Sequence, residues 1–74
     1  MTSYFIEDKE GNLLFPSYRV GELAPTTLEK GSGRFVGEQG KRTLEDKVSD
    51  FSRYHREKHG FRVVGYKSVF VKEV

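Results

Sequence analysis

TLEDKVSDFSRYHREKHG, residues 43–60, carries the signals of a single amphipathic helix. Thr43 is a good N-cap, because its hydroxyl can accept a hydrogen bond from a backbone N–H that the first turn leaves unpaired. Asp46, three residues on, completes a weak capping box. At the other end, Gly60 can adopt the left-handed conformation that ends many helices. We therefore predict one helix over about residues 43–59.

The apolar side chains of this helix are few and fall on one side. Leu44, Val48, Phe51 and His55 follow one another at steps of four, three and four residues, so they share one stripe. A short helix of this kind is marginal in water when it is isolated. The helix therefore needs a sheet against which to bury its stripe.

A predicted β-hairpin lies at the start of the chain. Residues 3–7 and 13–15 carry aromatic and aliphatic side chains, and the polar loop between them contains Gly11 and Asn12, which tolerate positive φ. Two weaker extended pieces, residues 18–20 and 34–37, follow further along.

The strongest β signals come after the helix, at residues 61–66 and 68–72. Apolar residues occur on both faces of this stretch. Either a turn or bulge between Gly65 and Ser68 resets the faces, or both faces are covered.

Residues 21–33 are dense in glycine, proline, serine and threonine, which predicts a flexible loop. The order of elements is then two strands, a loop, a short strand, a helix and one or two strands. This order indicates a single α+β domain over residues 1–74, with the helix packed on a small, largely antiparallel sheet.

The composition argues against a disulfide-linked, secreted or membrane-spanning protein. The chain of 74 residues has no cysteine, so it has neither a disulfide framework nor a thiolate metal site, which fits a reducing cytosol. Its first residues lack the basic and apolar regions of a signal peptide, and no apolar run reaches the length of a membrane span. We expect a cytoplasmic protein that has no membrane partner.

The net charge of +2 is unevenly distributed. Residues 1–29 hold two cations and five carboxylates, for a net charge of −3, whereas residues 30–74 hold eleven cations and six carboxylates, for a net charge of +5. A solvated surface accounts for this asymmetry as well as an anionic partner does. Such a partner is either nucleic acid or an acidic protein surface.

The candidate motifs for phosphate binding, metal binding and catalysis do not show the residue spacing that these functions require. The glycines before Lys41 do not match a phosphate-binding loop, because Phe35 stands where a Walker A loop needs glycine. His55 and His59 have the spacing of metal-binding helices, but no cluster supplies the third ligand that a catalytic zinc needs. No nucleophile elbow is present. We expect no catalytic residue, metal, cofactor or small-molecule substrate, and thus no enzyme.

With the catalytic motifs excluded, the remaining candidates are surface residues that could bind a partner molecule. Cations before the helix and in its second half are expected to form a continuous basic patch, although Arg53 and Glu57 stand at i and i+4 and can pair. Three tyrosines, Tyr4, Tyr18 and Tyr54, are expected to be partly exposed and to act as contact anchors. The predicted partner-binding residues are Arg34, Lys41, Arg42, Arg53, Arg56, Lys58, Tyr18 and Tyr54.

The chain from Arg34 onward resembles a known kind of protein. A short strand, the helix start TLED at residues 43–46, the entry GFRV at residues 60–63 and a terminal strand resemble small phage-encoded proteins that bind host RNA polymerase. The resemblance implies a non-enzymatic regulator in the host cytoplasm that contacts polymerase subunits and inhibits or redirects transcription. The best-known small inhibitors of that class are acidic on their contact surface, whereas residues 30–74 are basic here.

Two alternative functions stay open. One is a sequence-nonspecific nucleic-acid-binding protein, which would lose affinity steeply as salt rises. The other is an inhibitor or accessory subunit of another host enzyme.

Overall fold

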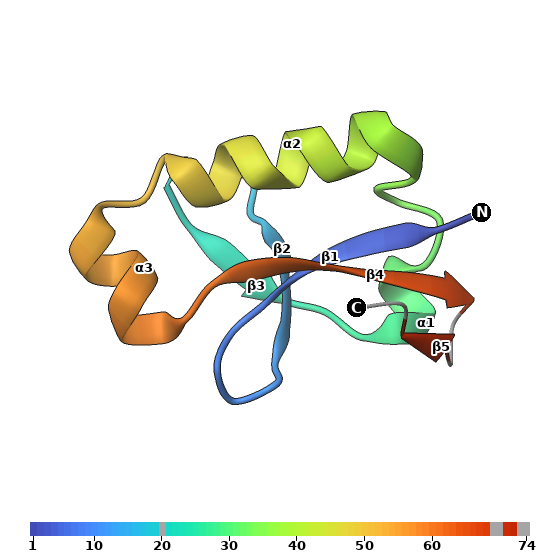
Figure 1. Ribbon diagram of the computed structural model, residues 1–74, viewed down its shortest axis with the longest axis horizontal. Coiled ribbons are helices and arrows are strands. Elements are labelled where there is room, and N and C mark those ends of the chain that lie inside the picture. Colours follow the sequence, from blue (N-terminus) through green and yellow to red (C-terminus); the bar gives the residue numbers. More distant parts are fainter. Residues whose placement is uncertain (20, 69–70, 73–74) are drawn as a thin grey trace.

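The computed structural model describes residues 1–19, 21–68 and 71–72 (Figure 1). These residues form three helices and an antiparallel sheet of five strands in the order β3-β2-β1-β4-β5. The elements in chain order are β1 (Ser3–Glu7), β2 (Leu13–Pro16), β3 (Leu23–Pro25), α1 (Leu28–Gly31), α2 (Gly37–Ser49), α3 (Arg53–His59), β4 (Arg62–Ser68) and β5 (Val71–Lys72). The predicted α+β fold, with a main helix packed on an antiparallel sheet, is confirmed.

The predicted hairpin of β1 and β2 is also confirmed, with Ile6 opposite Leu14. Its loop depends on Gly11, whose φ of 86° is the positive value that glycine adopts readily. β1 also pairs with β4 along its whole length, so it is the central strand of the sheet.

Both faces of the central strand are covered. Side chains alternate between the faces of a strand, so Phe5 and Ile6 point in opposite directions. Ile6 and Leu44 of α2 are fully buried, and α2 packs along β1 (Figure 1). On the other face, Phe5 stacks on Phe15 with 5.1 Å between the ring centroids.

α1 approaches closely on this second face, since a Cβ added to Gly31 would lie 2.3 Å from the Phe5 ring. In β4, Val64 is buried in the same cluster as Phe5 and Phe15, and α2 also packs on this strand, so the alternative that both faces are covered is correct. The predicted irregularity in β4 also exists, because the register with β5 shifts between Tyr66 and Ser68.

The predicted helix over residues 43–59 is wrong at its start. α2 begins at Gly37, and the Thr43 hydroxyl donates to the Gln39 carbonyl at 2.9 Å from inside the helix. The glycines obscure this start in the sequence, because glycine disfavours helix interiors. Gly40 is nevertheless required, since a Cβ there would lie 2.4 Å from the carbonyl carbon of Phe35.

The predicted helix is also interrupted. α2 ends at Ser49, and a new helix, α3, begins after Ser52, whose side-chain oxygen accepts from the His55 amide at 3.3 Å. Between the helices, Phe51 leaves the helical path and packs its ring 5.3 Å from that of Phe61. No helix among the described residues is long and apolar enough to cross a membrane.

The segment predicted as a loop, residues 21–33, contains β3 and α1. Thr27 caps α1 by accepting from the Lys30 amide at 3.1 Å, a short-range signal inside a stretch rich in turn residues. The prediction that this segment is a loop is therefore wrong for residues 23–25 and 28–31, which form a strand and a capped helical turn.

The remaining predicted strands are shorter than expected. Tyr18 and Arg19 form a bend, and Val20 lies outside the described residues. The piece predicted over residues 34–37 is a single bridge between Val36 and Ser3. In the stretch 68–72, residues 69–70 lie outside the described part and β5 occupies only Val71–Lys72.

Glu7 is a buried carboxylate at the end of β1. Arg62 and Lys72 reach its Oε1 atom at 2.7 and 3.0 Å. Burial raises the pKa of Glu7, but the hydrogen bonds and positive charges of Arg62 and Lys72 outweigh it, so the pKa lies below its ordinary value. This cluster ties the last strand to the first.

Candidate functional site

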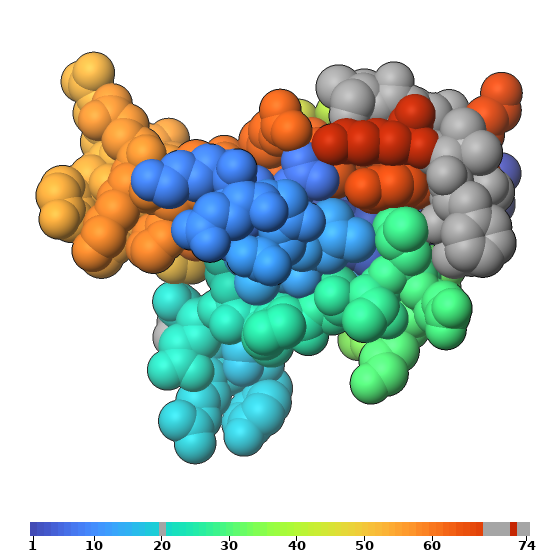
Figure 2. Space-filling model, turned by 90° about the horizontal axis from the view of Figure 1, so that it is seen from below, coloured from blue at the N-terminus to red at the C-terminus, as the bar shows by residue number. Residues whose placement is uncertain are grey.

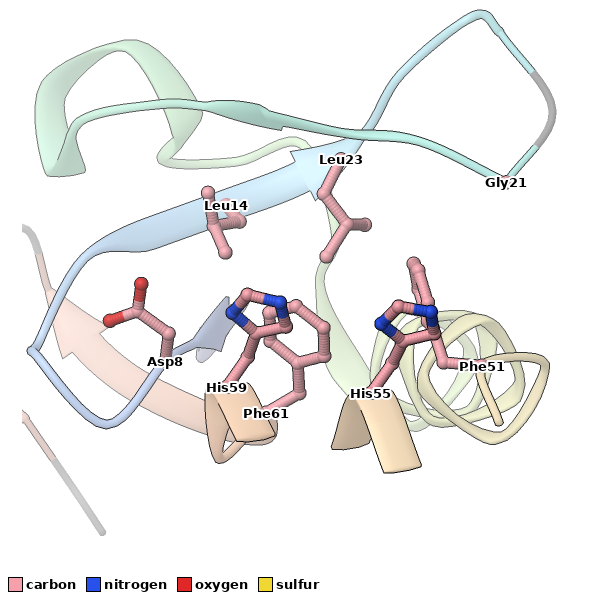
Figure 3. A pocket seen from close by; sticks show the side chains of 8 residues that line it. All are labelled: Asp8, Leu14, Gly21, Leu23, Phe51, His55, His59 and Phe61. Atoms are coloured by element: carbon pink, nitrogen blue, oxygen red, sulfur yellow. The ribbon is translucent and has the colours of Figure 1, made fainter. Parts of the chain in front are cut away.

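A shallow groove opens where α2 ends, between α3 and the strands β2 and β3 (Figure 3). Because α2 stops at Ser49, it leaves the far part of its sheet face uncovered. The groove has a volume of about 440 Å³, and every residue that lines it is half-buried or exposed. The lining residues are Asp8, Leu14, Gly21, Leu23, Phe51, His55, His59 and Phe61.

Two histidines form the α3 wall. In Figure 3 the imidazoles of His55 and His59 stand side by side and face Leu14 and Leu23 across the groove. The two rings are nearly parallel, with 6.3 Å between their centroids, and His59 stacks on Phe61 at 5.1 Å. One helical turn separates the histidines, so both lie on the same face of α3.

The cations of α3 lie on different sides of the helix. Successive residues turn by about 100° around a helix, so Arg56 and Lys58 flank the face of His55 and His59 on either side. Neither cation forms an ion pair with any other residue that the structure describes. Both stand near the C-terminal end of the helix, where the helix dipole favours positive charge.

The third cation is neutralised. Arg53 Nε lies 2.9 Å from Glu57 Oε1, and helical spacing places this pair on the side opposite the groove. Beside the groove, the ammonium of Lys58 lies 5.9 Å from the ring centroid of Tyr54, which is 67% exposed. An aromatic ring and a free cation therefore stand together on the rim.

Hydrogen bonds fix the C-terminal end of α3. Gly60 has a φ of 66°, and its amide donates to the Arg56 carbonyl at 2.8 Å. The amide of Lys9, in the β1–β2 loop, donates to the His59 carbonyl, also at 2.8 Å. The loop and the helix end are thereby held together.

Asp8 organises that loop. Its carboxylate accepts from the backbone amides of Glu10 and Asn12, both at 2.9 Å, and from the Asn12 side chain at 3.0 Å. The side-chain hydrogen bond of Asn12 is the main cause that lowers the pKa of Asp8. Slight desolvation opposes it, and the backbone bonds and the charge of His59 add to it.

A second hollow of about 510 Å³ adjoins the groove and shares Gly21, Phe51 and His55 with it. Its other lining residues are Glu22, Lys47, Asp50 and Ser52. Two carboxylates and one ammonium make this end net negative, whereas the α3 end carries unpaired cations. The charge therefore changes sign along the surface.

The histidine pair has the spacing of metal-binding helices. Within the described residues, no group of three or more histidine, cysteine, aspartate or glutamate side chains is arranged to hold a metal ion. The arrangement provides apolar contact, ring stacking and positive charge.

The structure separates the predicted binding residues into two groups. Arg53, Tyr54, Arg56 and Lys58 lie on α3, whereas Lys41 and Arg42 lie in the first half of α2. Arg34 precedes α2, which has thirteen residues and is therefore about 20 Å long. The predicted continuous basic patch is thus divided between α3 and the first half of α2 with the segment before it.

Two further predicted residues also lie apart. The Arg34 guanidinium stands 5.5 Å from the Phe15 ring centroid, on the sheet face away from α2. Tyr18 is 92% exposed in the β2–β3 turn, with the Arg19 guanidinium 6.0 Å from its ring. In Figure 2 this turn (cyan) and α3 (orange) project from the body of the molecule.

Sequence reasoning missed the apolar lining of the groove. Leu14, Leu23, Phe51 and Phe61 read as core positions, and nothing in their spacing indicates that they stay half-exposed. The cap at Ser52 is the one local signal that could have revealed the groove, because it ends the continuity of the helix.

Comparison with protein-family models, with curated proteins and with solved structures gives no match for this chain. The function must therefore be inferred from the geometry of the site.

Proposed function

We propose that this protein is a small non-enzymatic regulator that binds another protein through the groove and the parts of α3 that flank it. We call this region the α3 surface and define it by Tyr54, Arg56 and Lys58 together with the groove lining. The partner that we propose is bacterial RNA polymerase, whose transcription the protein would inhibit or redirect.

The observation that carries the proposal is the exposure of α3. All seven residues of this helix are exposed, so it adds no buried side chain to the core. A helix this short is unstable on its own. Ser52 and Gly60 nevertheless cap its two ends, and the Lys9 amide binds the His59 carbonyl. These hydrogen bonds keep an external surface in one shape, which lowers the entropy cost of binding.

The residue types on this surface suit a protein partner. Tyrosine and arginine are enriched at the centres of protein interfaces. Tyr54 and Arg56 lie on α3, and Tyr18 projects from the neighbouring turn. The half-exposed Phe51 and Phe61 supply apolar area between them that a partner could cover.

The choice of polymerase rests on the resemblance of residues 34–74 to phage-encoded polymerase-binding proteins. Nucleic acid fits this surface less well, because it carries a phosphate at every nucleotide, and Asp8, Glu22 and Asp50 in the two hollows would repel each phosphate that passes over them. The separation of Lys41 and Arg42, on the first half of α2, from the cations of α3 also argues against a long phosphate-tracking stripe.

Biolayer interferometry with purified bacterial core enzyme and holoenzyme, at about 0.15 M salt where surface charges are screened beyond about 8 Å, tests this proposal. We expect the double variant R56E/K58E to bind at least tenfold more weakly than the wild type. The control K30E/R42E makes the same charge change on exposed residues of α1 and α2, and we expect it to bind within twofold of wild type. Absence of binding to either enzyme would exclude polymerase, and equal loss in both variants would exclude the α3 surface.

A further inference from the structure

The partner's own chemistry can be inferred from the groove, on the basis of the proposed function. We infer that the α3 surface binds an extended acidic segment of a protein that carries a large apolar side chain. The apolar side chain would enter the groove, and the acidic residues would lie along α3.

The shape of the groove favours a protein segment. Its volume of about 440 Å³ is sufficient for a bulky side chain, and every lining residue keeps some exposure, so the groove is open along its length. An enclosed small-molecule site would bury most of its ligand. An open groove instead accepts a side chain from a chain that passes over it.

The composition of the groove selects an apolar anchor. Leu14 and Leu23 face the imidazoles of His55 and His59, and Phe61 lies behind His59 (Figure 3). Covering such apolar surface stabilises a complex by about 25 cal/mol for each Å² removed from water. A leucine or phenylalanine side chain would contact both walls.

The distribution of charge around the groove indicates that the bound segment is acidic and where its acidic residues lie. Arg56 and Lys58 flank the groove face of α3 and have no carboxylate partner among the described residues. Asp8 inside the groove, and Asp50 and Glu22 in the adjoining hollow, oppose acidic residues of a partner, so the groove itself takes the apolar side chain. Acidic residues of the bound segment therefore belong beside α3 and not beyond Phe51.

A peptide titration of the full-length ¹⁵N-labelled protein, followed by NMR, tests the inference. The probes are the capped peptide GDELFDEG, its basic counterpart GKKLFKKG, its polar counterpart GDESSDEG and the oligonucleotide dT8. We expect GDELFDEG to shift the amide signals of residues 51–61 and of Leu14 and Leu23. It should bind at least tenfold more tightly than the other three probes. The spectrum itself shows whether each variant is folded.

The same charge variants provide the control. The substitutions R56E/K58E should weaken the binding of the peptide GDELFDEG at least tenfold. The substitutions K30E/R42E should leave its affinity within twofold of the wild-type value. Equal binding of the basic or polar peptide, or shifts centred on another surface, would overturn the inference, and tighter binding of dT8 would replace it with nucleic-acid recognition. Polymerase binding through α3 without any peptide binding would refute only this inference. Peptide binding without polymerase binding would refute only the choice of polymerase.

Discussion

α2 and α3 are separated by only three residues, yet they are stabilised in different ways. α2 has no side-chain cap at its N-terminus, but it buries Leu44 against the sheet and Gly40 against the backbone of Phe35. α3 has a serine cap at one end and a left-handed glycine at the other, and it buries nothing. Packing holds the first helix, whereas hydrogen bonds at the ends hold the second. α2 therefore belongs to the core, whereas α3 lies exposed at the surface.

Leu44→Ala tests the packing half of this comparison and has the largest expected effect. Leu44 is fully buried under α2, and truncation of such a residue costs about 2–5 kcal/mol of unfolding free energy because it leaves a cavity. Denaturant unfolding followed by circular dichroism measures the loss. The control Arg42→Ala, on the exposed side of the same helix, should stay within about 0.5 kcal/mol of wild type. Equal values for the two variants would show that α2 does not pack as described.

Phe51→Ala tests the junction between the helices. A fully buried phenylalanine costs about 3–5 kcal/mol when it is truncated, but Phe51 is half-buried, so we expect about 2 kcal/mol. Tyr54→Ala, which removes an exposed ring three residues later, serves as the control and should have a much smaller effect. A loss of about 3–5 kcal/mol, the range for a fully buried phenylalanine, would mean that the groove is closed in solution.

Glu7→Gln tests how the buried cluster around Glu7 contributes to the pH dependence of stability. Since the pKa of Glu7 is lowered in the folded protein, its contribution is present above its ordinary value of 4.5 and is lost as the pH falls through the folded value. Glu7→Gln should lower the free energy of unfolding by about 1–2 kcal/mol at neutral pH. It should also reduce the decrease in that free energy at acidic pH, which we call the acid limb.

The control for this experiment is Asp8→Asn, one residue along the chain. Asp8 also has a lowered pKa, but it lies in the loop beside the groove and is far more exposed than Glu7. Its substitution should leave most of the acid limb unchanged. An acid limb that vanished in Asp8→Asn and persisted in Glu7→Gln would contradict the role given to the buried cluster.

Much of the fold could be predicted from local patterns. Alternating aromatic and aliphatic residues around Gly11 define the hairpin, and the β-branched stretch after Gly60 defines β4. The start of α2 could not be predicted, because Gly37 and Gly40 have low helix propensity. Gly40 is needed for the approach to Phe35, a contact that exists only in the folded chain.

The site was less accessible to sequence reasoning. The cations of α3 were identified from their position near a helix end, but their pairing was visible only in part, at Arg53 and Glu57. The apolar stripe that runs through Phe51 to His55 suggested a continuous buried helix. The cap at Ser52 instead redirects the chain and leaves the groove open. Because the lining comes from elements distant in sequence, its assembly depends on tertiary contacts.

The most direct test of the account is the unfolding free energy of the triple variant Y54A/R56A/K58A. These side chains are exposed on a helix that buries nothing, and surface substitutions usually change stability by less than about 0.5 kcal/mol. We predict that chemical denaturation gives a value within that range of wild type. A loss comparable to that of Leu44→Ala would show that α3 is part of the core and would contradict its role as a surface held ready for a partner.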